Sequence, residues 1–326
     1  ADAVMPKKEV RRNDRYVHYA WAATAEALRD AGIPTPIEDE ALAWRTGAII
    51  GSGIGGINSM IRDIVEAHEL GIDRIGPFLV TAMIPDMAAG YVAIYANARG
   101  PNYATVSACA TSNTAIMDAF NYIRLGKADI IISGGSEAAV NEAGMGGFNA
   151  MHALSTRNDS PETASRPFDA TRDGFVLGEG AGALILEEYE HARARGATIY
   201  AEVAGGGLSS DAYHMTAPHP DGIGVVRVMQ NCLRDAGVEP EEVDAINTHG
   251  TSTPLGDVAE LKAISQVFGA HAPEININST KSMTGHLLGA AGAIETIACI
   301  FAVKNDLAPP TTNHFTDDPQ LDNKLN

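Results

Sequence analysis

Short apolar runs alternate along the chain with longer segments in which apolar residues recur every three or four positions. The short runs predict buried strands, and the longer amphipathic segments predict helices. The predicted strands cover residues 47–52, 128–135, 182–188 and 243–249. Each predicted helix ends in glycine, a common helix stop; the helices cover residues 19–32, 112–126, 225–237 and 257–269. This alternation indicates a layered α/β fold.

One five-residue phrase occurs twice, as 28-LRDAG-32 and 233-LRDAG-237. Each copy closes a predicted helix and is followed by a predicted strand that leads to a glycine-rich turn. A repeated phrase is a weak sign of duplication, and a length of 326 residues suits two domains. We therefore predict an N-terminal half over residues 1–197 and a C-terminal half over residues 198–326.

The charge balance and the apolar runs narrow the class of protein. The net charge is −18 and the sequence pI is about 4.8. Nucleic-acid binders need a surface that neutralises phosphates, so this balance argues against a nucleic-acid partner. The first residues show no signal-peptide core, and no apolar run approaches the roughly 18 residues that a membrane span requires. We expect a cytoplasmic protein with no membrane partner.

The three cysteines are Cys109, Cys232 and Cys299. An odd number of widely spaced cysteines is no disulfide framework and suits a reducing compartment. Cys109 lies in 105-TVSACATSNTAIMDAF-120, where small residues surround it and an amphipathic helix follows. At a helix N-terminus the dipole and the free N–H groups favour the nucleophilic thiolate and can hold an oxyanion. A buried, inert cysteine explains this motif about equally well, and it explains Cys232 and Cys299 better.

Two histidines follow predicted strands. His249 ends the strand at 243–249, and His286 comes after a polar loop that carries Lys281 and opens a Gly/Ala-rich helix. Ligands bind at the carboxyl ends of strands in α/β sheets, and a nucleophilic cysteine needs a base or charge partner nearby. Cys109, His249 and His286 are therefore the candidate catalytic set.

A zinc site is the rival use of the same three residues, because thiolate and imidazole are good zinc ligands. The three residues are scattered singly and include no short-spaced ligand pair. We therefore expect no metal.

Six longer motifs run in order through nearly the whole chain and resemble the elongating β-ketoacyl-acyl-carrier-protein synthases of bacterial fatty acid synthesis. They are 105-TVSACATS-112, 154-LSTRND-159, 165-SRPFDATRDGFVLGEGAG-182, 209-SSDAYHMT-216, 248-THGTSTPLGD-257 and 280-TKSMTGHLLGAAGAIE-295. The resemblance implies a thiolase-like fold, with two similar α/β halves in a five-layered αβαβα sandwich and the active site between them. It also implies a homodimer that works with acyl-carrier protein.

The same resemblance implies roles for individual residues. Cys109 would carry the acyl group, with His249 and His286 facing its thiol and Lys281 in the active site. The implied supporting and binding residues are Glu295, a buried glutamate that helps hold the lysine; Thr251 and Thr253 for phosphopantetheine; Ile54 and Phe148 for the acyl-chain pocket; and Lys8, Arg11 and Arg12 for carrier-protein docking.

The implied reaction is a decarboxylative condensation of the acyl group on Cys109 with malonyl-acyl-carrier protein. It needs no cofactor beyond the phosphopantetheine arm that carries the substrates. A polyketide-type ketosynthase shares these motifs and would differ in substrate. A non-catalytic chain-length factor lacks the nucleophilic cysteine, and a degradative thiolase would carry a second cysteine in a comparable glycine-rich turn.

The resemblance also implies a further strand before Ala1 and a Gly-Phe-Gly-Gly loop with final strands after Asn326. We accordingly expect the chain to be an internal part of a longer enzyme. On its own we expect it to be inactive or poorly ordered, because missing strands leave backbone groups unpaired.

Overall fold

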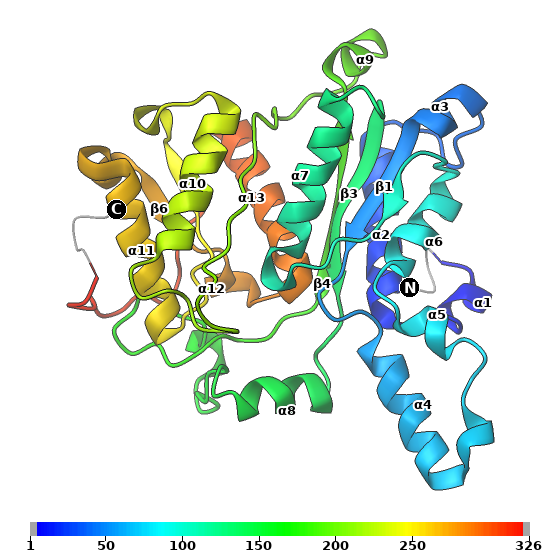
Figure 1. Ribbon diagram of the computed structural model, residues 1–326, viewed down its shortest axis with the longest axis horizontal. Coiled ribbons are helices and arrows are strands. Elements are labelled where there is room, and N and C mark those ends of the chain that lie inside the picture. The colour runs from blue at the N-terminus through cyan, green and yellow to red at the C-terminus, as the bar shows by residue number, and fades with distance from the viewer. Residues whose placement is uncertain (1–4, 322–326) are drawn as a thin grey trace. The chain divides into compact units, whose positions relative to one another are not determined.

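Residues 5–321 are described by a computed structural model (Figure 1). The chain divides into two compact units, and neither unit is continuous in sequence. Unit 1 comprises Ala1–Gly146, Gly178–Ile199 and Leu287–Ile297, and unit 2 comprises Gly147–Leu177, Tyr200–His286 and Ala298–Asn326. The boundary predicted at residue 197 lies close to the crossing between Ile199 and Tyr200. That boundary stays a prediction, because the chain also passes between the units elsewhere.

Unit 1 is built on a four-stranded sheet with the order β2-β1-β3-β4. Its strands are β1 (Thr46–Gly51), β2 (Asn102–Tyr103), β3 (Ile130–Glu137) and β4 (Gly180–Glu187). β1 is parallel to both β2 and β3, and β4 is antiparallel to β3. The strands predicted at 47–52, 128–135 and 182–188 are confirmed, whereas the two-residue strand β2 is too short to leave a pattern.

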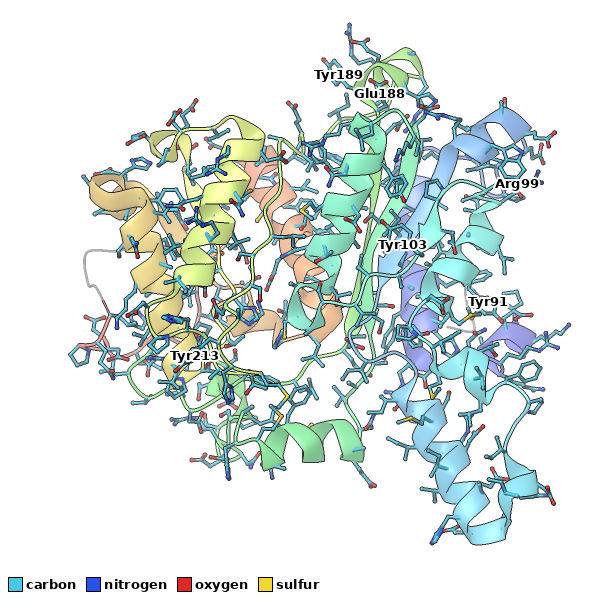
Figure 2. All side chains as sticks on the ribbon, in the orientation of Figure 1. Tyr91, Arg99, Tyr103, Glu188, Tyr189 and Tyr213 are labelled. Carbon is cyan, nitrogen blue, oxygen red and sulfur yellow. The ribbon has the colours of Figure 1, made fainter. Side chains whose placement is uncertain are left out.

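Helices cover both faces of this sheet. Ile50 and Ile132 pack on one side into a core with α2 (Arg15–Asp30) and α6 (Met87–Ala96). Their neighbours in sequence, Ile49 and Ile131, point to the other side, where they meet α7. α7 (Thr111–Arg124) lies along that face, and Figure 2 labels Tyr103 of β2. Tyr103 donates a hydrogen bond to Asp118 of α7 at 2.9 Å. Strands buried on both faces require continuous apolar runs, which is why their sequence pattern is so clear.

Shorter elements surround this core. The remaining helices with residues in unit 1 are α1 (Lys7–Val10), α3 (Glu40–Arg45), α4 (Ile57–Leu70), α5 (Leu79–Met83), α8 (Glu142–Ala150), α9 (Tyr189–Ala194) and α13 (Ala291–Asn305). α8 and α13 continue into unit 2. The 3₁₀ turns of the chain are η1 (Ile72–Arg74), η2 (Ala108–Ala110), η3 (Pro161–Thr163), η4 (Pro240–Glu242), η5 (Gly269–Glu274) and η6 (Leu288–Ala290).

Unit 2 alternates helices and strands in the order α10, β5, α11, β6 and α12. The bounds are α10 (Ile223–Ala236), β5 (Ala245–Asn247), α11 (Pro254–Phe268), β6 (Asn276–Asn278) and α12 (Lys281–Thr284). β5 and β6 are parallel, and they are the strands of this unit within the described part of the chain. Leu261, Ile264 and Phe268 of α11 form its apolar core together with Ile275. The predicted helices at 225–237 and 257–269 are confirmed.

The two LRDAG phrases close their helices in the same way. Gly32 after α2 and Gly237 after α10 both have φ of 66°. In each case the next residue donates its backbone N–H to the leucine carbonyl of the phrase, Ile33 to Leu28 at 3.0 Å and Val238 to Leu233 at 3.1 Å. This is the glycine helix cap expected of a left-handed residue at that position. Equal sequences therefore give equal local structures in the two units.

The expectation that no apolar run is long enough to span a membrane is wrong for one stretch. Leu288–Asn305 is helical, long and apolar enough to cross a membrane by length and composition alone. Core helices of soluble proteins satisfy the same criterion. Here the first residues of α13 are buried, and a Cβ on Gly292 would lie 2.2 Å from Asn113 Oδ1 of α7. Close packing within unit 1 therefore accounts for the small apolar residues at the start of this helix.

Candidate functional site

Cys109 occupies the tight turn η2 immediately before α7. The preceding residue, Ala108, has a φ of 51°, which is strained for any residue except glycine. Two hydrogen bonds hold the turn: Ser107 N donates to Thr111 Oγ1 at 3.0 Å, and Thr105 Oγ1 donates to the Thr111 carbonyl at 2.9 Å. Cys109 is partly buried. Its predicted place at a helix start is confirmed.

The other two cysteines differ from each other. Cys232 is partly buried, and desolvation, followed by the charge of Asp235, raises the pKa of its thiol. Cys299 is exposed, so the prediction that it is a buried residue is wrong. Its position on α13 lies beyond the buried first turns of that helix.

The candidate residues of unit 1 gather at one edge of its sheet. Because β1, β2 and β3 are parallel, their carboxyl ends meet at the same edge. The loop after β1 carries Ile54, the chain after β2 carries Cys109, and β3 ends at Glu137. Ile54 is partly buried, and its backbone N–H donates to Glu137 Oε1 at 3.2 Å. Sequence reasoning missed Glu137, although a charge at the end of the apolar run 130-IIISGGS-136 is a visible signal.

Unit 2 brings the two histidines together. His249 lies two residues after β5, and its ring centroid is 5.3 Å from that of His286, with the rings nearly perpendicular at 87°. His286 is only 2% exposed, and its backbone N–H donates to the Val176 carbonyl at 2.7 Å. The prediction that His286 opens a helix is wrong. It follows α12 in an extended segment that bridges to Leu177, and α13 begins at Ala291.

Both rings are held in the neutral form. Desolvation lowers the pKa of His286, and the neighbouring His249 and Lys281 lower it further. Desolvation, followed by the Lys281 charge, also lowers the pKa of His249. By accessible surface His249 is exposed and His286 is buried. A neutral imidazole keeps one N–H donor and one acceptor nitrogen.

Lys281 and Glu260 are two charged residues close to the histidines. Lys281 is the first residue of α12, is only 2% exposed, and accepts a hydrogen bond at its carbonyl from Ser165 Oγ at 2.7 Å. Glu260 of α11 accepts the backbone N–H groups of His249 at 2.6 Å and Gly250 at 2.8 Å. Desolvation raises the pKa of Glu260, and these hydrogen bonds and the Lys281 charge oppose that rise. Sequence reasoning missed Glu260, whose only signal is a carboxylate shortly after the histidine motif.

A row of aromatic rings continues from His286. The ring of Phe175 packs edge-to-face against His286 at 5.3 Å and against Phe148 at the same distance. Phe148 lies in α8 and is partly buried. The structure thus places a residue predicted to line the acyl pocket one ring away from a predicted catalytic histidine.

The predicted phosphopantetheine residues lie in the loop before α11. The hydroxyl oxygens of Thr251 and Thr253 are 3.0 Å apart. Between them, Ser252 has a φ of 67°; its hydroxyl accepts from Arg166 N at 3.0 Å and its carbonyl from Gly174 N at 3.0 Å. The 166–174 segment therefore holds this loop in a strained conformation.

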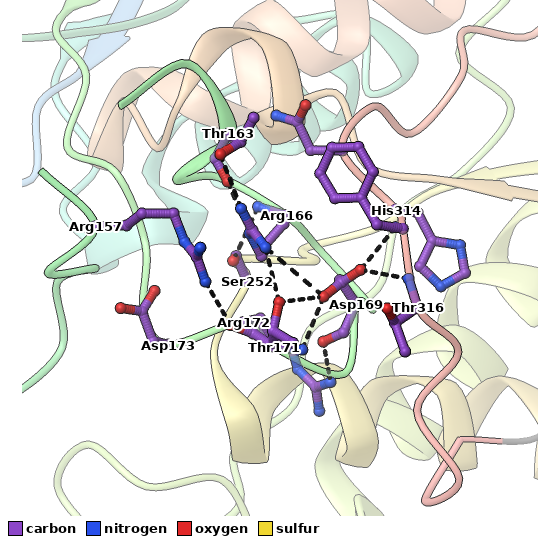
Figure 3. A network of polar contacts seen from close by, with 12 residues as sticks. Arg157, Thr163, Arg166, Asp169, Thr171, Arg172, Asp173, Ser252, His314 and Thr316 are labelled. Atoms are coloured by element: carbon purple, nitrogen blue, oxygen red, sulfur yellow. Dashed lines mark hydrogen bonds and ion pairs between the residues drawn. The ribbon is translucent and has the colours of Figure 1, made fainter. Parts of the chain in front are cut away.

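Figure 3 shows the polar network beneath that loop. Asp169 accepts hydrogen bonds from the backbone N–H groups of Thr171, Phe315 and Thr316. Desolvation raises the pKa of Asp169, but these hydrogen bonds outweigh it and hold the pKa well below the usual range. Arg172, only 6% exposed, donates to the carbonyls of Thr253 at 3.2 Å and Pro254 at 2.9 Å.

Two buried carboxylates balance the Arg172 charge. Asp318 Oδ2 accepts from Arg172 at 2.6 Å, and Asp257 Oδ2 lies 3.4 Å from its Nε. Burial raises the pKa of Asp257 to about 6, against the opposing effects of the Phe168 N–H and the guanidinium. Arg172 therefore ties the loop that carries Thr253 to α11 and to the C-terminal segment of the described chain.

The remaining predicted residues lie elsewhere. Glu295 is in α13 and is partly exposed, so the prediction of a buried glutamate is wrong, and its role toward Lys281 stays a prediction.

Lys8, Arg11 and Arg12 lie on or directly after α1. The Arg12 guanidinium stacks over the Phe78 ring at 4.9 Å.

Removing the Arg172 charge should destabilise unit 2. Arg172→Met leaves Asp257 and Asp318 buried without a counter-charge, so we expect the free energy of unfolding to fall by about 3–5 kcal/mol. Denaturant titration measures the change. Arg193→Met is the matched control, because Arg193 forms an exposed pair with Glu190 at 3.3 Å, and such a pair contributes about 0–1 kcal/mol. Equal losses in both variants would contradict this account.

Family models match both parts of the chain. The N-terminal domain of β-ketoacyl synthase matches residues 3–192, and the C-terminal domain of β-ketoacyl synthase matches residues 200–315. The chain is 50% identical over 316 residues to 3-oxoacyl-[acyl-carrier-protein] synthase 2 of Staphylococcus aureus, covering 97% of this chain and 75% of that protein. It is 48% identical over 322 residues to the protein of the same name from Synechocystis, covering 99% and 77%.

Solved structures agree with these relatives. A β-ketoacyl synthase from Burkholderia phymatum is 39% identical, with a TM-score of 0.89 over 97% of this chain and 76% of that one. A type II polyketide ketosynthase, solved with its acyl-carrier protein and bound to the hexaketide, is 37% identical, with a TM-score of 0.90 over 94% and 76%. The comparisons confirm the thiolase-like α/β fold and the acyl-transferring, condensing enzyme class predicted from sequence. The chain belongs to the β-ketoacyl synthase family.

Proposed function

We propose that this chain uses Cys109, His249 and His286 to condense an acyl group with malonyl-acyl-carrier protein, giving 3-oxoacyl-acyl-carrier protein and CO₂. The observation that carries the proposal is the place of Cys109, in a strained turn at the start of α7 and at the carboxyl edge of three parallel strands. Its relatives at about half identity are 3-oxoacyl-[acyl-carrier-protein] synthases.

Acyl transfer is the first half-reaction. The Cys109 thiolate attacks the carbonyl of the acyl-carrier thioester, a C–S bond forms, and the tetrahedral oxyanion collapses to expel the carrier thiolate, which takes up a proton. The dipole of α7, a helix of 14 residues, favours the thiolate at its N-terminal end. Partial activation by the helix lets this step proceed without a dedicated base.

Decarboxylation and condensation follow. The malonyl thioester loses CO₂, and the electron pair of the broken C–C bond becomes an enolate. The enolate carbon attacks the Cys109 thioester, and collapse of that adduct breaks the C–S bond and releases the Cys109 thiolate. The enolate oxygen carries the developing charge. Two neutral imidazoles, each with an N–H donor, suit this role because fixed donors in a dry site stabilise an oxyanion strongly.

Lys281 adds a buried positive charge close to both rings. It helps to keep them neutral, since a neighbouring cation disfavours protonation of an imidazole. Thr251 and Thr253 are proposed to contact the phosphopantetheine arm, and Ile54 and Phe148 the acyl chain. The reaction so written requires no further cofactor, because both substrates arrive on carrier-protein arms.

The proposed carrier dock lies at the start of unit 1. Of the three proposed docking residues, Arg11 and Arg12 line a cavity of about 240 Å³, whose walls also include Arg62 and Arg74. Two acidic residues, Asp63 and Glu66, also line it, so the arginines outnumber the carboxylates. In a chain of charge −18, this concentration of arginine suits an acidic partner. A related ketosynthase has been solved in complex with its acyl-carrier protein.

A polyketide-type substrate is the second candidate, because one solved structure similar to this chain is a type II polyketide ketosynthase bound to a hexaketide. Two others are ketosynthases together with a chain length factor. The identity of about half to fatty-acid-type relatives, against 37% to the hexaketide enzyme, favours the fatty-acid branch. We further propose that the protein is cytoplasmic and acts as a homodimer.

Cys109 alone should become acylated. Cys109→Ala is expected to abolish acyl transfer while leaving the unfolding free energy within about 1 kcal/mol, because the side chain is only partly buried. Mass spectrometry of tryptic peptides after incubation with acyl-carrier substrate locates the label. Cys232→Ala serves as the control and should acylate normally. A label on Cys232 or Cys299 would show that the nucleophile is misassigned.

Loss of either histidine should affect decarboxylation more than acylation. His249→Ala and His286→Ala are expected to slow malonyl decarboxylation by about 10²–10³-fold, the usual cost of losing an oxyanion donor, and acyl transfer far less. His68→Ala, on the exposed face of α4, is the control. Since the pKa of both rings lies below the ordinary 6.5, both stay neutral as the pH falls through 6.5, and decarboxylation should show no inflection there. Equal loss of both half-reactions would refute this division of roles.

Charge reversal should weaken carrier docking alone. Arg11→Glu with Arg12→Glu is expected to raise KM for carrier-bound substrate by about tenfold and to reduce its salt dependence. KM for a small pantetheine thioester should stay unchanged. Arg234→Glu, an exposed arginine of unit 2, is the control. An equal rise for both substrates would place the effect in the active site and not in a dock.

A further inference from the structure

Glu137 is a buried carboxylate that the reaction described above does not use. It ends β3, and its side chain is 0% exposed. Among the described residues it has no basic partner. An uncompensated charge in a protein interior is costly, so its retention calls for specific hydrogen bonds.

Those hydrogen bonds occupy both oxygens. Oε1 accepts from Ser52 Oγ at 3.0 Å and from Ile54 N at 3.2 Å. Oε2 accepts from Gly53 N at 2.9 Å and from Gly289 N at 3.0 Å. Burial raises the pKa of Glu137, and these four bonds oppose the rise. Three of these four donors are backbone N–H groups, which cannot accept a proton, so the geometry favours the ionised form.

The same contacts reach the turn of Cys109 from two directions. A Cβ placed on Gly53 would lie 2.7 Å from Glu137 Oε2 and 3.5 Å from the Ala108 carbonyl oxygen. The loop that Glu137 binds therefore packs against the residue just before Cys109. On the other side, Ser112 Oγ in the first turn of α7 donates a short hydrogen bond to the Gly289 carbonyl. Gly289 is thus held by Glu137 at its N–H and by α7 at its carbonyl.

We propose that Glu137 is a positioning residue that fixes the Cys109 turn through Gly53 and Gly289. The proposal rests on the proposed function of Cys109 as the acyl carrier. Ala108 stays at positive φ only while its surroundings hold it there. Without the carboxylate, the loop after β1 and the η6 turn lose their common anchor, and the thiol loses its fixed line of attack.

Acyl transfer from a small pantetheine thioester to Cys109 tests this role without involving the carrier dock. Glu137→Gln keeps the size of the side chain but turns an NH₂ group toward two N–H donors. We expect the maximal single-turnover rate to fall by about 100-fold with the half-saturating thioester concentration within about threefold, because misplacement of a reacting group by about 1 Å costs that much. Glu137→Asp keeps the charge on a shorter arm and should give an intermediate rate.

Asp14→Asn is the matched control. Asp14 is also a buried carboxylate of unit 1, 2% exposed, and it accepts the backbone N–H of Ser59 at 2.6 Å. Its side-chain partners, Asn58 and Ser59, belong to α4 and not to the Cys109 turn. Thermal melting should show comparable destabilisation in both amide variants, and only Glu137→Gln should lose its acyl-transfer rate. An Asp14→Asn variant slowed to the same degree would overturn the proposal.

A folded Glu137→Gln protein that transfers acyl groups at the parent rate would also overturn it. If Glu137→Gln does not fold, Ser52→Ala removes one of the four donors, and acyl transfer should slow by about fivefold, the equivalent of one hydrogen bond. An unchanged rate in Ser52→Ala then counts against the proposal. Cys109→Ala separates the proposed nucleophile from the proposed positioning role. If Cys109→Ala is still acylated, Cys109 is not the nucleophile. If Cys109→Ala is not acylated but Glu137→Gln reacts at the parent rate, only the positioning role of Glu137 is refuted.

Discussion

Close approach of the strand ends to the first turn of α7, at the carboxyl edge of the unit 1 sheet, is the constraint on which the candidate nucleophile depends. A Cβ on Gly51 would lie 2.2 Å from Thr111 Cγ2, and one on Gly135 would lie 2.4 Å from Ser112 Oγ and 2.6 Å from the Gly289 carbonyl. Real Cβ atoms do not approach so closely. The strand ends and the first turn of α7 can therefore meet only where the strand residue is glycine. This contact sets how close to the sheet Cys109, just before α7, lies.

In unit 2 the candidate residues are charged or polar and mostly buried, so they must be held by ion pairs and hydrogen bonds. Lys281 and Arg172 are almost fully buried cations. Asp257 and Asp318 balance the charge of Arg172. The Arg172 guanidinium also donates to the Thr253 carbonyl and so holds the loop that carries Thr253. Such a network contributes less to stability than an apolar core of the same size would. Its value is positional, since it holds a loop with a left-handed Ser252 in one conformation.

The sequence alone predicted the strands and helices with long, regular apolar patterns and the position of Cys109 at a helix start. It could not predict the two-residue strand β2, whose pairing depends on tertiary contacts, nor the extended conformation of His286. The Gly- and Ala-rich stretch from Gly285 reads as one helix, but Gly285 has a φ of 71° and the helix α13 starts only at Ala291. Glu137 and Glu260 were missed because the sequence does not show which backbone N–H groups a single carboxylate will accept, and these groups lie at least ten residues away along the chain.

These two residues share one physical task with Asp169. Glu137 in unit 1 and Glu260 and Asp169 in unit 2 each accept two or more backbone N–H groups from loops that follow strands or strained turns. Such loops cannot pair their N–H groups in a sheet, and a buried donor left unpaired would cost about 1–3 kcal/mol. A carboxylate is the smallest side chain that offers four acceptor positions and no donor. An amide of equal size would present hydrogens to those donors, which is worse than losing a bond. The loops that carry candidate catalytic residues are therefore held by acceptors that an amide of equal size cannot replace.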